Sequence, residues 1–252
     1  MVDAERLPVL TFHSISEAAG PTSIPPGTFA MQMQALADAG FTSCTMAEYA
    51  AWHAGQGNGE RRLLITFDDA FCDFAEAAAP IMRRHGFAAT VFVPTALVGS
   101  PEAWAGANSP ARKLLDWDAI RALQAEGFEF GSHSRTHAYL PKLPQQEREC
   151  EIADSAAELS AATGRPAEAF AAPYGAVDAE TVALIARHYP IAFGTRFDVS
   201  RREEARHDIP RLDMHYFRSE ATWRGFLAGD RGYFTVRRAL RAVRGAARKL
   251  AA

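Results

Sequence analysis

Cysteine is scarce and scattered in this chain. Its 252 residues include three cysteines, at positions 44, 72 and 150, and no two of them have CxxC spacing. An odd and scattered set predicts neither a disulfide framework nor a zinc knuckle, and it fits a reducing compartment. The chain begins with a polar segment that lacks the basic and apolar regions of a secretory signal peptide. We therefore expect a cytoplasmic protein.

Long apolar runs and a strong net charge are missing as well. No run approaches the roughly 20 apolar residues that a membrane-spanning helix needs. The formal net charge is −3 at pH 7, which argues against a general nucleic-acid-binding protein. What remains is an ordinary globular composition, in a chain long enough for one α/β barrel or two small domains.

The most informative stretch is a β-prone run that ends in two adjacent carboxylates, from Leu63 to Ala70 (LLITFDDA). It predicts a buried strand that delivers Asp68 and Asp69 to its carboxyl end. Neighbouring strand residues point to opposite faces, so the two acids can take different roles. Burying both costs several kcal/mol unless cations or hydrogen-bond donors compensate them. A helix N-cap is the structural alternative, but it accounts for only one aspartate.

Strand and helix patterns alternate along almost the whole chain. After the acid pair, a helical segment at 71–85 precedes an apolar strand pattern at 88–94. Strand, helix and strand within about 30 residues form a βαβ unit, which implies a parallel sheet. No linker or internal repeat interrupts the pattern, so we expect one α/β domain over residues 1–230 and a helical tail over 231–252. Further strand patterns lie at 9–14, 41–45, 128–132, 169–172, 191–194 and 209–214.

The tail, residues 231–252, is strongly basic. It has six arginines, one lysine and no acid, a charge of +7, which leaves −10 for the rest of the chain. Such a helix can lie on anionic lipid or bind an acidic polymer. We favour the alternative that it packs against the acidic body. Peripheral contact with an anionic inner-membrane surface stays the other interpretation.

A second stretch with chemical character, His133-Ser134-Arg135-Thr136-His137, follows another predicted strand. Two histidines four residues apart can bind one metal ion, although such a pair is common by chance. α/β folds place their sites at the carboxyl ends of strands. One carboxylate and two imidazoles would leave positions open for water and substrate, as in a catalytic metal site. The second carboxylate would then be free to act as a base.

These two stretches resemble the first two motifs of the polysaccharide deacetylases, the NodB homology domain or carbohydrate esterase family 4. TFDDA at 66–70 is similar to the family's TFDDG, and HSRTH at 133–137 is similar to its H-[ST]-x-x-H. FAAPYG at 170–175 falls where the third motif is expected, and the resemblance covers roughly residues 7–215. It implies a single-domain distorted (β/α) barrel, which the alternation of strands and helices supports independently.

The resemblance also implies a catalytic site with one divalent metal ion, usually Zn²⁺, with Co²⁺, Ni²⁺ or Fe²⁺ as alternatives. Asp69, His133 and His137 would be its ligands. Asp68 would be the general base that deprotonates the attacking water. The metal would polarise the amide carbonyl and lower the pKa of the water toward about 7.

Five residues are expected on the substrate side of this site. The third motif would form the wall of the acetyl pocket, with the backbone N–H of Tyr174 holding the oxyanion. Trp104 would line a substrate groove or, alternatively, cover the core. The five residues are Trp104, Pro173, Tyr174, Gly175 and Arg211.

The chain departs from the family pattern in two motifs. Ala70 stands where the first motif has glycine, a change that matters only if this residue needs a positive φ. The third motif commonly begins with an arginine that orients the catalytic aspartate, and here Ala171 or Ala172 takes its place. We hypothesise that Arg211 reaches in to replace that arginine. Its alternative is an ordinary structural or surface role.

Two histidines compete for the role of general acid toward the leaving amine. Many family members carry this histidine late in the chain, in a motif that LDMH at 212–215 imitates. One branch, which resembles the poly-N-acetylglucosamine deacetylases, has instead an N-terminal strand that ends in histidine and a Pro-Tyr-Gly third motif. LTFH at 10–13 resembles that branch, so we favour His13 over His215.

The predicted function is a metal-dependent hydrolase that removes the N-acetyl group from an N-acetylated sugar. The substrate would be a polysaccharide, an oligosaccharide, or a lipid- or nucleotide-linked intermediate. Two alternatives stay open. One is a deformylase or amidase that acts on a non-sugar or lipid-linked substrate by the same chemistry. The other is a catalytically degenerate relative that binds glycan.

Overall fold

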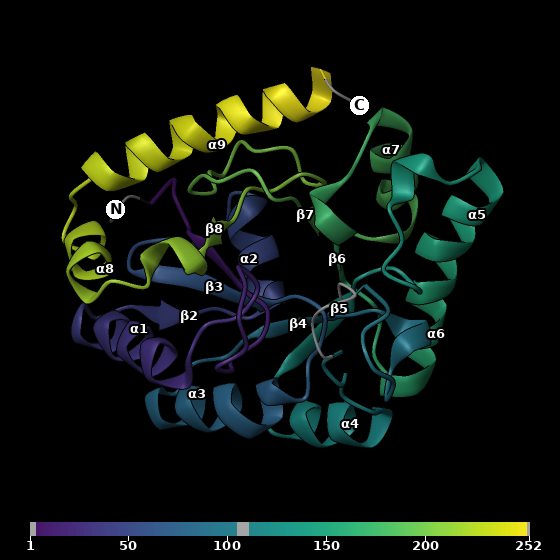
Figure 1. The fold of residues 1–252 in the computed structure, drawn as a ribbon, viewed down its shortest axis with the longest axis horizontal. Coiled ribbons are helices and arrows are strands. Elements are labelled where there is room, and N and C mark those ends of the chain that lie inside the picture. The colour runs from purple at the N-terminus through teal and green to yellow at the C-terminus, as the bar shows by residue number, and fades with distance from the viewer. Residues whose placement is uncertain (1–3, 105–110, 251–252) are drawn as a thin grey trace.

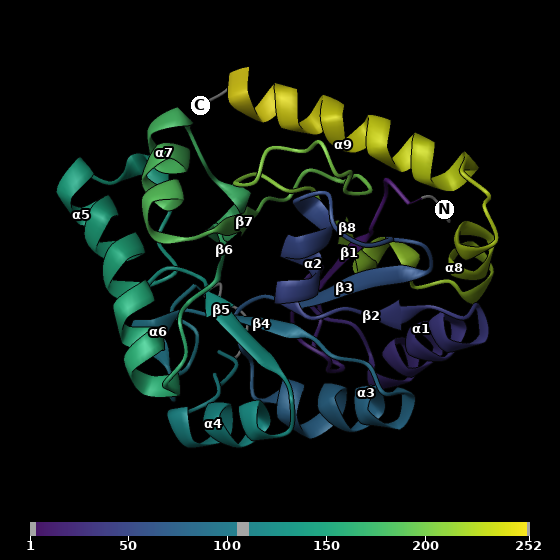
Figure 2. The ribbon, with the colours of Figure 1, turned by 180° about the vertical axis from the view of Figure 1, so that it is seen from behind.

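Parallel strands curl into an open barrel, and the helices lie around its outside (Figures 1 and 2). The computed structural model describes residues 4–104 and 111–250, with side chains up to residue 243. Around the curl the strand order is β7-β6-β5-β4-β3-β1-β8, and β2 pairs with β3. The strands are β1 (Val9–Phe12), β2 (Thr42–Ser43), β3 (Arg62–Phe67), β4 (Thr90–Val93), β5 (Glu129–Ser132), β6 (Ala169–Ala171), β7 (Ile191–Phe193) and β8 (Leu212–Asp213). The fold is the distorted (β/α) barrel that the sequence predicted.

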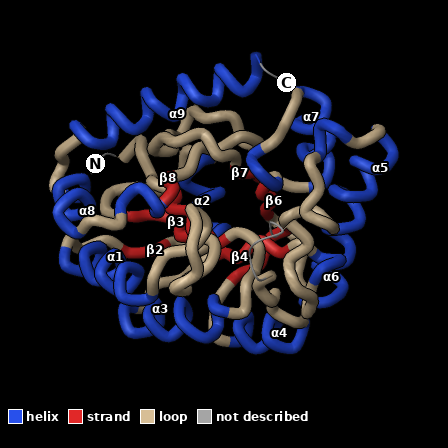
Figure 3. The backbone as a smooth tube through the Cα atoms, viewed as in Figure 1, coloured by secondary structure: helices blue, strands red, loops and turns tan. Residues whose placement is uncertain are grey.

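Helices follow most strands and cover the outer face of the sheet (Figure 3). In the described part of the chain, none is long and apolar enough to span a membrane. They are α1 (Pro26–Asp38), α2 (Met46–His53), α3 (Ala79–His85), α4 (Trp117–Ala125), α5 (Gln145–Glu149), α6 (Ser155–Thr163), α7 (Ala179–His188), α8 (Glu220–Leu227) and α9 (Gly232–Leu250).

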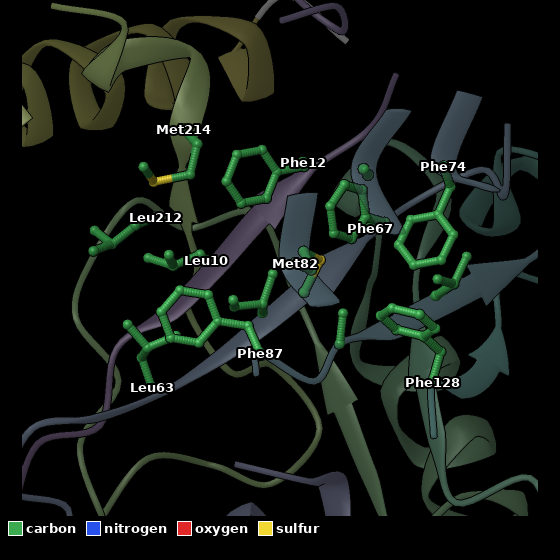
Figure 4. Close-up of a cluster of buried hydrophobic side chains, with 14 of the residues drawn as sticks. Leu10, Phe12, Leu63, Phe67, Phe74, Met82, Phe87, Phe128, Leu212 and Met214 are labelled. Carbon is green, nitrogen blue, oxygen red and sulfur yellow. The ribbon is translucent and has the colours of Figure 1, made fainter. Parts of the chain in front are cut away.

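Aromatic packing between β1, β3 and the helices forms the centre of the core (Figure 4). The rings of Phe12 and Phe67 stack with centroids 5.1 Å apart. Phe74 packs edge-on against Phe67 at 4.8 Å and against Phe128 at 5.2 Å. β1 and β4 are buried at every residue, as expected for parallel strands covered on both faces. This core holds the ends of β1 and β3, where the predicted site residues begin.

The gap between the edge strands β7 and β8 is bridged by the chain itself. The N–H of Gly194 donates to the carbonyl of Ile209 at 2.8 Å, and the N–H of Ile209 donates to the carbonyl of Ala192 at 3.1 Å. The strand expected over 209–214 is therefore reduced to the two residues of β8. This bridge positions the segment between residues 209 and 212 beside the interior of the barrel.

Two of the expected helices contain a π-helical turn, which the sequence periodicity did not predict. One turn, Phe74–Ala78, precedes α3 inside the helix expected over 71–85. The other, Cys150–Asp154, joins α5 to α6, so that a helical pattern continues from residue 145 to residue 163. π turns are rare and occur often at functional sites. Each of these two turns has a carboxylate that accepts a hydrogen bond from a neighbouring loop. The carboxylate is that of Asp73 at the first turn and that of Glu151 at the second.

The basic tail is helical, as predicted, and α9 lies across the outside of the barrel (yellow in Figure 1). Arg238 pairs with Asp198 at 3.1 Å and Arg241 pairs with Asp213 at 3.0 Å. The ring of Phe234 is buried against the body. These are the contacts expected of a basic helix packed on an acidic body. The division of the chain at residue 230 stays a prediction.

Candidate active site

Three side chains of metal-ligand type converge at the carboxyl ends of β3 and β5. Asp69 follows β3, and His133 and His137 follow β5. The Nε2 atoms of His133 and His137 lie 3.4 and 3.2 Å from Oδ1 of Asp69. The three ligand atoms lie within 4.8 Å of one another, and all three residues are buried. The structure thus brings together the three residues predicted to bind a metal ion.

The chemistry of this cluster fits a divalent metal ion. In the described part of the chain, Oδ1 of Asp69 is buried without a hydrogen-bond partner, which is costly unless a cation completes it. Nδ1 of His133 lies 2.7 Å from the carbonyl oxygen of Ala171. This contact favours the tautomer that leaves the Nε2 lone pair free for a metal. Burial lowers the pKa of His137, so this imidazole is neutral and able to coordinate.

The loops that carry these ligands have left-handed backbone conformations. The φ angles of Asp69, Ala70 and His137 are 75°, 56° and 59°. Residues other than glycine adopt this region at a cost on the order of 1 kcal/mol each. Ala70 stands where the first motif has glycine. Because its φ is positive, this exchange of glycine for alanine does affect the backbone.

Glu151 holds the loop between the two histidines. Its Oε2 accepts hydrogen bonds from the backbone N–H groups of Arg135 and Thr136, both at 2.9 Å. Its Oε1 accepts a hydrogen bond from Oγ1 of Thr136 at 2.7 Å. Glu151 is buried and lies in the π turn between α5 and α6. Glu151 therefore restrains the loop from which both imidazoles extend. The sequence did not point to Glu151, because its periodicity did not predict the π turn.

Asp68 is paired with Arg211 in the interior of the barrel. Nη1 and Nη2 of Arg211 each donate to one oxygen of the Asp68 carboxylate at 2.7 Å, which is a bidentate contact. Nε of Arg211 donates to the carbonyl of Gly194 at 2.9 Å. Burial raises the pKa of Asp68, but the Arg211 guanidinium and the nearby imidazoles outweigh burial and lower it. The carboxyl group is therefore ionised at neutral pH.

The contact hypothesised between Arg211 and Asp68 is present, and the place of Arg211 among the substrate-side residues stays a prediction. Its side chain is completely buried. Its guanidinium donates hydrogen bonds to Asp68, to Oγ1 of Thr66 and to the carbonyl of Gly194. It reaches the site from the segment just before β8, which the bridge between β7 and residue 209 holds against the barrel.

Of the two candidate general acids, His13 lies at the site. Its Nε2 is 3.9 Å from Oδ2 of Asp68, and its side chain is 25% exposed. Asp73 holds the segment that follows, since it accepts hydrogen bonds from Oγ of Ser14 at 2.5 Å and from the N–H of Ile15 at 2.8 Å. His13 is therefore restrained beside Asp68 while remaining accessible.

His215 lies in the short helical turn Met214–Phe217 after β8. Its ring packs edge-on against Tyr216 at 5.7 Å. Burial lowers the pKa of His215, and the charges that act on it belong to Asp213, Arg218 and Arg237. These neighbours come from the β8 region and α9. His13 is the one of the two histidines with an ion-pair contact to Asp68 among the described residues, and the choice of the general acid stays a prediction.

Aromatic rings border the metal-ligand cluster. Trp104 stacks on His137 with ring centroids 3.8 Å apart. Tyr174 packs edge-on against the same imidazole at 4.6 Å, and Tyr139 lies 6.0 Å from Tyr174. Tyr174 and Tyr139 are 55% and 46% exposed, so a large ring surface faces solvent beside the cluster. Trp104 thus contacts the site, whereas residues 105–110 of its predicted loop lie outside the described residues.

Tyr139 was missing from the expected substrate-side residues. It lies two residues after His137, and the next residue, Leu140, is fully buried and anchors the segment. An aromatic residue close to a metal-ligand motif and outside any apolar periodicity is the signal that could have identified it.

The third motif forms a tight turn beside the imidazoles. Pro173 is buried, Tyr174 has a φ of 60° and Gly175 has a φ of 64°. A Cβ atom on Gly175 would lie 2.0 Å from Oγ1 of Thr195. Only glycine fits there, and the turn keeps the Tyr174 ring against His137. The predicted wall residues therefore do lie beside the cluster, and their contact with substrate stays a prediction.

Replacing Ala70 with glycine should leave the free energy of unfolding nearly unchanged. The variant relieves a left-handed conformation worth about 1 kcal/mol but loses a buried methyl group worth about 0.8 kcal/mol. Ala78→Gly is the matched control, because Ala78 is buried with a φ of −72°. The control should lose about 1–2 kcal/mol. Urea denaturation measures both, and an equal loss in the two variants would contradict the strain assigned to Ala70.

Glu151→Gln should weaken metal binding while leaving the fold intact. The amide keeps one acceptor oxygen, so the loop that carries both histidines loses part of its restraint. We expect the affinity for Zn²⁺ to fall roughly tenfold or more, as for other supports of metal ligands. Competition with a chelator measures the affinity, and Glu147→Gln, an exposed acid on α5, is the control. Equal affinities in the two variants would argue against this role.

Known proteins that are similar to this chain include polysaccharide deacetylases. The family model for polysaccharide deacetylase matches residues 55–191, which is more than half of the chain. YxkH of Bacillus subtilis (strain 168), named as a polysaccharide deacetylase, is 28% identical over 151 residues, or 60% of this chain and 50% of YxkH. A gellan lyase of a Bacillus species is 29% identical over 196 residues, or 74% of this chain and 7% of the lyase. The chain therefore spans half or less of the length of these two relatives.

Two solved structures share the fold. IcaB from Ammonifex degensii superposes with a TM-score of 0.75 and 24% identity, and the match covers 88% of this chain and 98% of IcaB. The Streptococcus pyogenes deacetylase PplD, solved in complex with acetate, has a TM-score of 0.72 and 22% identity, with 82% and 91% covered. At these identities the likeness establishes the fold alone. Taken with the family match over residues 55–191, these findings mean that the chain belongs to the polysaccharide deacetylase family.

Proposed function

We propose that this chain is a metal-dependent hydrolase that removes the N-acetyl group from an N-acetylated sugar. The observation that carries the proposal is the buried cluster of Asp69, His133 and His137 beside the ion pair of Asp68 and Arg211. Membership of the polysaccharide deacetylase family supports the reaction class.

Asp69, His133 and His137 would hold one divalent ion, with Zn²⁺ the first candidate and Co²⁺, Ni²⁺ or Fe²⁺ the alternatives. When bound, such an ion polarises the amide carbonyl and lowers the pKa of water toward about 7. The chain itself contributes preorganisation, because Glu151 and the carbonyl of Ala171 restrain the two histidines.

Asp68 is the proposed general base. Because Arg211 and the imidazoles keep the pKa of Asp68 low, its carboxylate is available to accept a proton from the attacking water. The bidentate contact with Arg211 keeps that carboxylate in one orientation. Arg211 therefore serves as a positioning residue for the base.

In the proposed reaction, the oxygen of water bonds to the carbonyl carbon and the amide C–N bond breaks. The products are acetate and a free amine on the sugar. His13 would donate the proton that the leaving nitrogen takes up, and its partly exposed ring beside Asp68 supports this role. The backbone N–H of Tyr174 would donate to the developing oxyanion, and Pro173 and Gly175 would shape the wall beside it.

The aromatic border supports a sugar as the substrate. The apolar faces of a sugar ring pack well on aromatic rings, which also line most small-molecule sites. Trp104, Tyr174 and Tyr139 supply such rings within a few ångströms of the metal-ligand cluster. A small non-sugar amide would leave the exposed ring of Tyr139 without a role.

A cytoplasmic location and a peripheral contact with an anionic inner-membrane surface are also proposed. The small and scattered set of cysteines supports the first. For the second, Val236, Leu240 and Val243 form an exposed apolar row on α9. The ion pairs of Arg238 and Arg241 with the body use part of the basic charge, so this row rather than the charge alone would meet the lipid.

Metal content and acetate release test the reaction class together. The purified chain should bind one Zn²⁺ and release acetate from N-acetylglucosamine oligomers, and a chelator should stop the release. His133→Ala should lose the ion and on the order of a hundredfold or more in rate, since a catalytic ion contributes several kcal/mol. His188→Ala, at the end of α7, is the control and should behave like the unaltered chain.

The other outcomes separate the alternatives. Formate release from N-formyl substrates without acetate release would identify a deformylase. Glycan binding without any product would identify a degenerate relative. A chain that binds no ion after dialysis against Zn²⁺, measured by mass spectrometry, would refute the mechanism.

Arg211→Lys should move the acidic limb of the pH–rate profile to higher pH. Lysine keeps the charge but loses the bidentate fork, so the pKa of Asp68 rises toward its ordinary value. A larger fraction of the base is then protonated at acidic pH. kcat should fall with little change in KM, and the profile is measured from about pH 4 to 9. Arg187→Lys, an exposed arginine on α7, is the control.

The same pair makes a stability contribution of defined sign. The pKa of Asp68 in the folded chain lies below its unfolded value. The contribution is therefore fully present above the unfolded pKa, near 4, and is lost as the pH falls through the folded pKa. If the acidic limb of the pH–rate profile is the same in Arg211→Lys as in the unaltered chain, Arg211 does not position the base.

A further inference from the structure

A pocket of about 240 Å³ opens beside the first turns of α9. Four arginines contributed by three separate segments of the chain converge on it. Arg6 precedes β1, Arg201 lies in the loop after β7, and Arg231 and Arg238 flank the start of α9. The polar residues that line it are Arg6, Arg201, Arg231, Arg238, Asp198 and Thr235.

The backbone brings these segments together. Arg6 and Arg201 face each other in an isolated antiparallel bridge. Arg231 and Arg238 are seven residues apart, and this spacing places them on the same side of α9. The convergence therefore comes from the fold and not from a run of basic residues in the sequence.

Four guanidinium groups and one carboxylate, that of Asp198, line the pocket within the described part of the chain. Arg238 already engages its carboxylate at 3.1 Å, and Arg196 lies 3.9 Å from it. Burial and the neighbouring charge of Arg6 lower the pKa of Arg231, whereas the charge of Asp230 acts in the opposite direction. Like charges held together in this way are stabilised by a bound anion.

We propose that this pocket binds a phosphate-bearing anion, a diphosphate or a phosphodiester. Guanidinium groups bind phosphate oxygens in bidentate geometry, and the hydroxyl of Thr235 offers a further donor. The amino-terminal end of α9 adds positive potential on the same side. The volume is larger than a single phosphate needs, so the pocket has room for a second phosphate or an esterified group.

The pocket is separate from the metal-ligand cluster. Arg6 precedes β1 and His13 follows it, so the two sites lie at opposite ends of this strand. An anion bound here would anchor the protein and take no part in the hydrolysis. The anion belongs either to a soluble phosphate compound or to a phospholipid headgroup. The exposed apolar row of Val236, Leu240 and Val243 on α9 would contact the membrane that carries such a headgroup.

Two binding measurements on the full chain with bound Zn²⁺ test the proposal. Calorimetric titration at low salt with inorganic pyrophosphate tests a soluble source. Sedimentation with vesicles of phosphatidylglycerol, against vesicles of phosphatidylcholine, tests a lipid source. Arg201→Glu is the informative variant, because Arg201 is exposed and its reversal should weaken binding about tenfold or more. Arg187→Glu makes the same charge change on α7, outside the pocket, and is the control.

Each possible outcome either supports or overturns the proposed anion-binding pocket. Pyrophosphate binding that Arg201→Glu weakens and Arg187→Glu does not would establish a site for soluble phosphate compounds. Selective binding to phosphatidylglycerol with the same dependence would establish a headgroup site. No binding of either probe, or equal effects of the two variants, would overturn the proposal. Acetate release and thermal melting should be the same in all three proteins, which separates this result from a failure of the active site or of folding.

Discussion

The burial of two adjacent carboxylates, Asp68 and Asp69, is the constraint on which the rest of the site depends. An ionised carboxylate in a barrel interior costs several kcal/mol unless opposite charge and donors compensate it. The two acids are compensated differently. Asp68 receives both forks of Arg211, whereas Oδ1 of Asp69 has two imidazoles at 3.2–3.4 Å and no hydrogen bond within the described residues. The first carboxylate is compensated by a guanidinium, and the second has the arrangement that a bound cation would complete.

This difference supports the two roles proposed for the pair. A carboxylate already satisfied by a guanidinium binds a metal poorly but stays ionised and oriented, as a base must. A carboxylate without a donor beside two imidazoles is a ligand set. The compensating groups come from distant parts of the chain, since Arg211 precedes β8 and His133 follows β5. The hydrogen bonds between residue 209 and the β7 segment therefore also hold the stretch of chain that brings Arg211 to Asp68.

Local sequence patterns predicted the parts of this arrangement that are themselves local. A β-prone run followed by two acids predicted β3 and its carboxyl end, and the spacing of His133 and His137 predicted a shared ligand site. Arg211 could only be hypothesised, because no periodicity links residue 211 to residue 68. Glu151 and Tyr139 were missed for a related reason, since one depends on a π turn and the other on the exposure of a side chain beside a site. Ala70 shows the same limit, because the sequence shows that alanine replaces glycine there but does not show that its φ is positive.

The tail illustrates why net charge alone does not say which face of a helix will be used. Seven positive charges in 22 residues predicted a helix attracted to negative charge, and the largest nearby source of negative charge is the body of the protein itself. Arg238 and Arg241 therefore turn inward to Asp198 and Asp213, and Val236, Leu240 and Val243 are left facing solvent. Arg238 and Asp198 also line the pocket at the start of α9, together with Arg231. The tail thus presents arginines to the body and an apolar row to solvent, two features that a count of charges cannot distinguish.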